Sequence, residues 1–132
     1  MGRVARRWTA ARAVQIVAID HVQLAMPAGG EAEAREFYSL VLGLTEVPKP
    51  HALAARGGAW FESDRIKIHL GVDADFRAAK KAHLALIVQE LGELVDRLRN
   101  AGYDVVAGDK LPGLERVFVE DPFGNRLELI EK

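Results

Sequence analysis

Three histidines and one glutamate lie in segments whose apolar residues alternate as they do in β-strands. His21 opens one segment, His69 lies inside a second, His83 opens a third and Glu128 lies inside the last. Because successive side chains of a strand point to opposite faces, each lies opposite the more apolar residues of its strand. Neutral imidazole and carboxylate bind zinc, nickel, manganese or iron(II) without thiolate. The set therefore indicates a divalent-metal site, although each histidine alone is also explained as a hydrogen-bonded strand residue; His51, after a proline, is expected to be structural.

Other side chains of these strands would form the walls of a ligand cleft. Trp60, Phe61 and Phe118 lie on alternating segments, where an aromatic side chain is more often part of the core. Arg116 and Lys67 would suit an anionic substrate, but solvated charges at the edge of a sheet explain them equally well. The sequence leaves both interpretations open.

The elements that position these residues occur in the same order in both halves of the chain. Each half has a strand, a helix and three short strands, and each opening strand is led by a histidine. The predicted elements cover residues 16–26, 31–42, 51–55, 59–62 and 65–72, and then 83–88, 91–101, 103–107, 115–120 and 126–131. This repeat predicts one α+β domain over residues 16–132, built from two βαβββ modules at 16–74 and 80–132. Curved mixed sheets would form a half-open barrel around a cleft, with His21 and His83 in equivalent positions.

Composition excludes several classes of protein. The 132 residues contain no cysteine, which excludes a disulfide scaffold, a thiolate zinc site and a cysteine nucleophile. A net charge of −1 offers no case for nucleic-acid binding, and no apolar run is long enough for a membrane span. We expect a soluble, cytoplasmic protein.

The first residues differ in charge from the rest of the chain. Residues 1–14 hold four arginines and no acid. We expect residues 1–15 to be a dispensable basic extension; a transit-type peptide and an amphipathic surface helix are the alternatives.

Two motifs resemble those of a known family. Residues 36–44, Glu-Phe-Tyr-Ser-Leu-Val-Leu-Gly-Leu, follow a strand led by histidine and resemble the first signature of the vicinal oxygen chelate superfamily. Residues 121–129, Asp-Pro-Phe-Gly-Asn-Arg-Leu-Glu-Leu, resemble its second signature. This superfamily includes glyoxalase I, fosfomycin-resistance thiol transferases, extradiol dioxygenases and bleomycin-resistance proteins, and the resemblance covers residues 16–132.

The resemblance implies metal ligands at His21, His83 and Glu128. His69 occupies the place where glyoxalase I enzymes usually have a glutamate, so it would be a fourth ligand. Because metal-bound carboxylates also act as bases in those isomerases, this departure puts the glyoxalase I reaction itself in doubt. Dioxygenases of the superfamily are usually longer chains with an additional domain, so the length of this chain argues against that branch.

The expected function is therefore a metal-dependent enzyme acting on a small oxygenated substrate. Its metal would act as a Lewis acid, and the reaction would be an isomerisation, a lyase reaction or a thiol or epoxide addition. His69 or Glu128 would be the base. The alternative is a bleomycin-resistance-like protein that sequesters a small molecule without metal. Those proteins generally lack the histidine and glutamate set that this chain retains. A structural or regulatory module acting through the basic extension is the third class.

We also expect a homodimer. A βαβββ module has an open sheet edge and an unfilled face, and pairing with another module removes both. The resemblance favours pairing between chains in short members of the family. In that arrangement His21 would come from one chain, and His83 and Glu128 from the other, giving two equivalent sites.

Overall fold

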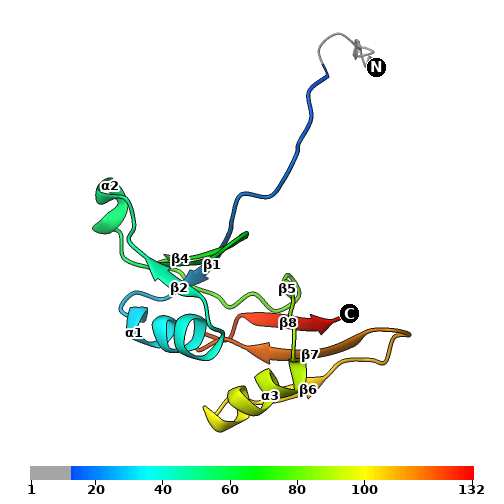
Figure 1. Ribbon diagram of the computed structural model, residues 1–132. Coiled ribbons are helices and arrows are strands. Elements are labelled where there is room, and N and C mark those ends of the chain that lie inside the picture. The colour runs from blue at the N-terminus through cyan, green and yellow to red at the C-terminus, as the bar shows by residue number, and fades with distance from the viewer. Residues whose placement is uncertain (1–12) are drawn as a thin grey trace, which may run out of the picture.

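A computed structural model describes residues 13–132. Of the basic extension predicted over residues 1–15, residues 1–12 lie outside the described part of the chain. Residues 13–20 are exposed and lie away from the sheets, and the chain runs from there toward the first strand, which begins at Val22 (Figure 1). The prediction that this strand begins at residue 16 is wrong. Val22 pairs with Ile68 in a parallel register, so the segment before residue 20 runs past Ile66, where the neighbouring strand begins.

The strands form two four-stranded mixed sheets with the same internal order. Sheet A has the order β1-β4-β3-β2 and sheet B the order β5-β8-β7-β6. In each sheet the first pair is parallel and the other two pairs are antiparallel. Sheet A comprises β1 (Val22–Met26), β2 (Thr45–Val47), β3 (Ala59–Ser63) and β4 (Ile66–Val72). Sheet B comprises β5 (Leu84–Ile87), β6 (Val105–Ala107), β7 (Glu115–Glu120) and β8 (Arg126–Glu131).

The helices lie between these strands in the chain. They are α1 (Glu31–Ala34), which continues directly into the π-helix η2 (Arg35–Val41), then α2 (His51–Ala54) and α3 (Leu91–Asn100). The predicted helix over residues 31–42 is confirmed in position, with its second part wound as a π-helix. The strand predicted near 51–55 is wrong: the segment is one helical turn. Pro50 is fixed at a φ of −52° and is followed by an alanine-rich sequence with high helix propensity. The short strand β2 was not predicted.

Each sheet buries one face beneath a helix. Tyr38 of η2 stacks on Phe61 of sheet A at a ring distance of 5.5 Å, and both side chains are fully buried. In sheet B, Leu127 and Leu129 are fully buried and face the same core as Leu98 of α3. The strand-face prediction is confirmed for Ile68 and Leu70 of β4 and for Leu127 and Leu129 of β8, which are buried, whereas Ile66, expected on the same face of β4, is 42% exposed. The candidate site residues lie on the opposite faces.

The predicted turn at residues 121–125 joins the two halves. The hydroxyl of Tyr38 donates a hydrogen bond to Asp121 Oδ2 at 2.6 Å, and Asn125 Nδ2 donates to the carbonyl of Ala25 at 2.9 Å. Asp121 also accepts hydrogen bonds from the backbone N–H groups of Phe123 and Asn125. The α+β fold of two equivalent sheets is confirmed, and within one chain the sheets remain separate rather than closing into a barrel (Figure 1). Within residues 13–132, the helices are all too short or too polar to cross a membrane.

Candidate functional site

On sheet A, two of the predicted histidines belong to a stack of three rings. The register places His69 of β4 beside Trp60 of β3. The Trp60 and His69 rings lie 3.9 Å apart and almost parallel, at 3°, and His21 stacks on His69 at 4.4 Å and 19°. His69 is therefore only 4% exposed, between the rings of Trp60 and His21. Its position is fixed by aromatic neighbours rather than by the core.

Acidic groups contact both histidines of this stack. Glu62 Oε2 lies 3.3 Å from His69 Nε2, and Asp20 Oδ2 lies 2.9 Å from His21 Nδ1. Burial lowers the pKa of His69, and the hydrogen bond with Glu62 opposes this only in part. The hydrogen bond with His21 and the charge of Lys67 lower the pKa of Asp20. His69 is thus favoured as a neutral imidazole, the form that binds a metal or accepts a proton.

On sheet B, His83 and Glu128 lie in direct contact. His83 Nε2 is 3.0 Å from Glu128 Oε1, and Arg116 Nη1 donates to Glu128 Oε2 at 2.9 Å. The hydrogen bond from Arg116 is the main cause that lowers the pKa of Glu128, with His83 adding to it against the effect of burial. Glu128 is 7% exposed and is held as a carboxylate on this face.

The contact of the other ring nitrogen of His83, Nδ1, bears on which nitrogen of the ring carries the proton. His83 Nδ1 lies 3.0 Å from the carbonyl oxygen of Lys81, an atom that can only accept a hydrogen bond. If Nδ1 carries the proton, Nε2 presents a lone pair to the carboxylate of Glu128, so a cation must lie between them. That cation is a second proton on His83 or a metal ion. A backbone carbonyl that fixes the tautomer in this way is typical of metal-binding histidines.

The structure brings the predicted residues together as two pairs, not as one set of four. Within residues 13–132, no group of three or more histidine, aspartate or glutamate side chains is arranged to hold an ion. The separation of His83 Nε2 and Glu128 Oε1 suits adjacent ligands at about 2.1 Å from a metal, which lie roughly 3.0–3.4 Å apart. The stacked rings of His21 and His69 do not suit one ion as they stand, because it must lie in the plane of each ring. For both histidines to bind one ion, one of the two rings would have to turn.

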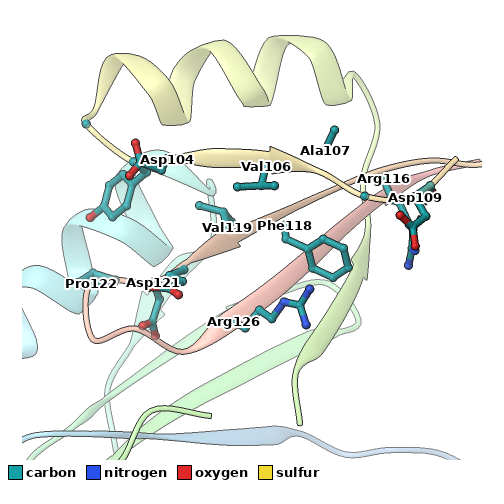
Figure 2. A pocket seen from close by; sticks show the side chains of 14 residues that line it. Asp104, Val106, Ala107, Asp109, Arg116, Phe118, Val119, Asp121, Pro122 and Arg126 are labelled. Atoms are coloured by element: carbon teal, nitrogen blue, oxygen red, sulfur yellow. Dashed lines mark hydrogen bonds between the residues drawn. The ribbon is translucent and has the colours of Figure 1, made fainter. Parts of the chain in front are cut away.

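A pocket of about 750 Å³ lies over sheet B, and its lining includes Arg116, the residue that donates a hydrogen bond to Glu128 (Figure 2). Its lining includes Arg116 and Phe118 of β7 and Arg126 of β8. Phe118 therefore lines a pocket, whereas Phe61 belongs to the core. A pocket of this size is typical of sites for small molecules.

Sequence reasoning missed Glu62 as a partner of His69. The turn between β3 and β4 has two residues, so Ser63 pairs with Ile66, and Glu62 and Trp60 then pair with Lys67 and His69. The Ser-Asp turn signal at residues 63–64 could have fixed this register. The remaining histidine, His51, is exposed on α2 and belongs to neither pair.

The fold and the sequence match a known family. The chain belongs to the Glyoxalase/Bleomycin resistance protein/Dioxygenase superfamily, whose family model matches residues 18–129. This confirms the resemblance in the two sequence motifs. No curated protein matches the chain.

Solved structures give the same result. A protein described as a glyoxalase family member from Bacillus anthracis is 43% identical, with a TM-score of 0.86 over 92% of this chain and 99% of that one. A glyoxalase family protein from Enterococcus faecalis is 22% identical, with a TM-score of 0.68 over 86% of this chain and 97% of that one. The fosfomycin resistance protein FosX from Listeria monocytogenes is 15% identical, with a TM-score of 0.73 over 89% of this chain and 95% of that one. The last two show the shared fold.

Proposed function

We propose that this protein is a divalent-metal-dependent enzyme that works in the cytoplasm as a homodimer on a small oxygenated substrate. One chain would supply His21 and His69 to each site, and the second chain would supply His83 and Glu128. The observation that carries the proposal is the contact of His83 Nε2 with Glu128 Oε1 while Nδ1 faces a carbonyl oxygen. The two atoms are spaced as adjacent ligands of one metal ion would be.

The need for a second chain follows from the arrangement of the two sheets. Each sheet presents one donor pair, meaning two side chains that could donate to a metal, on the face opposite its core. Each sheet also has an edge strand, β1 or β5, at equivalent positions. Unpaired strand edges favour association with another strand. Twofold pairing of sheet A from one chain with sheet B from the other would bring two donor pairs into each of two equivalent sites.

Each residue would then have a distinct chemical role. A metal bound at the site would act as a Lewis acid toward substrate oxygen atoms. His69 and Glu128 are the groups able to accept a proton, and Glu62 would orient the His69 ring. Arg116 would hold the carboxylate of Glu128 in place. This set of residues suits an isomerisation, a lyase reaction or a thiol or epoxide addition.

Metal-free sequestration of a small molecule is the second candidate. The observation that favours it is the ion pair of Arg116 and Glu128, which together with a doubly protonated His83 satisfies the carboxylate without metal. The pocket over sheet B would then hold the molecule.

Metal analysis of the full chain, purified without an affinity tag, separates the two candidates. We expect one divalent ion per chain in the wild type, and loss of the ion in His83→Ala and Glu128→Ala. His51→Ala is the matched control, because it removes a histidine outside both pairs, and it should keep the ion. A wild-type protein that binds none of zinc, nickel, manganese or iron(II) would overturn the proposal in favour of sequestration.

A further inference from the structure

Arg126 places a guanidinium on the uncovered face of sheet B, where its cross-strand neighbour Glu120 is paired with Lys80 instead. Its side chain is partly buried, and within the described residues 13–132 no carboxylate forms an ion pair with it. The guanidinium carbon lies 3.9 Å from the centre of the Phe118 ring. An aromatic face stabilises a cation but accepts none of its N–H groups in the way that an oxyanion does. Arg126 is therefore held in position with its donors available.

The other charged groups that line the pocket are largely occupied. Arg116 is bound to Glu128, and Glu120 is paired with Lys80 at 2.8 Å. The Asp121 carboxylate accepts the hydrogen bonds of the turn and of Tyr38 described above. Asp104 and Asp109 flank β6, which is separated from β8 by β7. Arg126 is thus the cation that remains for a ligand, as its direction into the pocket in Figure 2 indicates.

The support beneath this cation is closely packed. Phe118 lies between the two arginines, with Arg116 Cζ 5.3 Å from its ring centre. At Gly108 a Cβ atom would lie 2.9 Å from Arg116 Nε and 3.1 Å from Phe118. Glycine at this position therefore allows the chain after β6 to pass close to both side chains.

We propose that Arg126, supported by Phe118, binds an anionic oxyacid group of the ligand, such as a carboxylate or a phosphate-type group. The guanidinium offers two parallel N–H donors that match the geometry of such a group. This inference rests on the proposed function, because it names the substrate class of the same site.

The position of Arg126 also sets the spacing between the anionic group and the reacting oxygen of the substrate. Arg126 and Glu128 lie two residues apart on the same face of β8, which is about 7 Å along a strand. A molecule that reaches from one to the other needs only a few atoms between its anionic group and its reacting oxygen. The substrate class is therefore a small oxygenated acid.

Anion binding by the full chain after removal of metal with a chelator tests this inference. Benzoate and inorganic phosphate are the probes, titrated separately and followed by the NMR shifts of backbone amides of β7 and β8, which every variant retains. Arg126→Gln should weaken binding of at least one probe by about tenfold or more, the effect of losing hydrogen bonds to a charged group. Arg126→Lys should give an intermediate loss, because it keeps the charge but not the paired donors. Preference for benzoate or for phosphate identifies the type of anionic group.

Arg56→Gln is the matched control, because Arg56 is exposed after α2 and the change in charge is the same. It should bind both probes as the wild type does. Equal binding by the wild type and Arg126→Gln, or by the wild type and Arg126→Lys if the first variant does not fold, would overturn the inference. Metal content is measured separately in each variant. Anion binding that depends on Arg126 in a protein that binds no metal would refute the proposed enzyme while leaving this inference standing.

Discussion

Replacement of Tyr38 by Phe tests the hydrogen bond that connects the two halves of the fold. The side chain is fully buried, and its hydroxyl donates a 2.6 Å hydrogen bond to Asp121 across 83 residues of sequence. Burial is the main cause that raises the pKa of Tyr38 well above its ordinary value, and the charge of Asp121 adds to it. The hydroxyl thus remains a donor throughout the neutral pH range.

The size of the effect follows from what the substitution leaves behind. Phe keeps the ring against Phe61, so no large cavity forms. Asp121 Oδ2 keeps its 3.0 Å hydrogen bond from Asn125, so the carboxylate is not left without a partner. The loss is that of one hydrogen bond to a charged acceptor, about 1.5–3 kcal/mol of the free energy of unfolding. For a domain of this length, that corresponds to a fall in Tm of roughly 5–12 °C.

Thermal and denaturant unfolding of the full chain measure this effect. Tyr103→Phe is the matched control, because Tyr103 is only partly buried and its contact with Phe37, at a ring distance of 4.9 Å, needs no hydroxyl. That variant should stay within about 0.5 kcal/mol of the wild type. If Tyr38→Phe were as stable as Tyr103→Phe, the packing of the two halves against each other would not depend on this hydrogen bond.

Two further predictions concern the turn before β3. The backbone N–H of Gly58 donates a 2.8 Å hydrogen bond to Glu31 Oε2 and lowers the pKa of Glu31. This stabilisation is full above the pKa of the unfolded chain and is lost as pH falls through the lower folded value. Glu31→Gln should therefore unfold with a smaller change in stability between pH 7 and pH 3, and a pH dependence like that of the wild type would contradict this. Gly58→Ala should lower the free energy of unfolding by more than about 3 kcal/mol, because the φ of Gly58 is +86° and a Cβ atom would overlap the Leu70 carbonyl. Gly43→Ala should lower it by only about 1–2 kcal/mol, because Gly43 has a similar φ of +83° but lies in open space. Equal losses in urea unfolding would refute the steric argument.

The sequence was sufficient to assign the faces of the strands. Alternation alone placed His69 opposite Ile68 and Leu70, and both apolar residues are buried in the structure. Two of the strands of sheet B, β7 and β8, have the predicted bounds. These features were predictable because a half-buried strand has a period of two residues.

Short segments and tertiary contacts were harder to predict. The segment that starts at His51 alternates like a strand, but Pro50 and the following alanines make it a helical turn. Strand β2 has only three residues and exists through its pairing with β3. The contact of Tyr38 with Asp121 joins residues far apart in the chain, which a local pattern does not reveal.

The relation between the two donor pairs was not predictable from alternation. The pattern shows which side chains share a face of one sheet, but not how the faces of two sheets are placed. In the structure His21 lies against His69, and His83 lies against Glu128. Symmetry of the repeat predicted equivalent positions for His21 and His83, and in the proposed dimer the pairing of modules would bring the two pairs together.

Subunit exchange between two metal-deficient variants tests the shared site most directly. His21→Ala has an intact sheet B pair, and Glu128→Ala has an intact sheet A pair. After the two proteins are mixed, each heterodimer should regain metal at one of its two sites, where the intact pairs meet. Metal content of the isolated heterodimer is the measurement. Recovery of one ion per heterodimer supports sites built from two chains, whereas no recovery would contradict them.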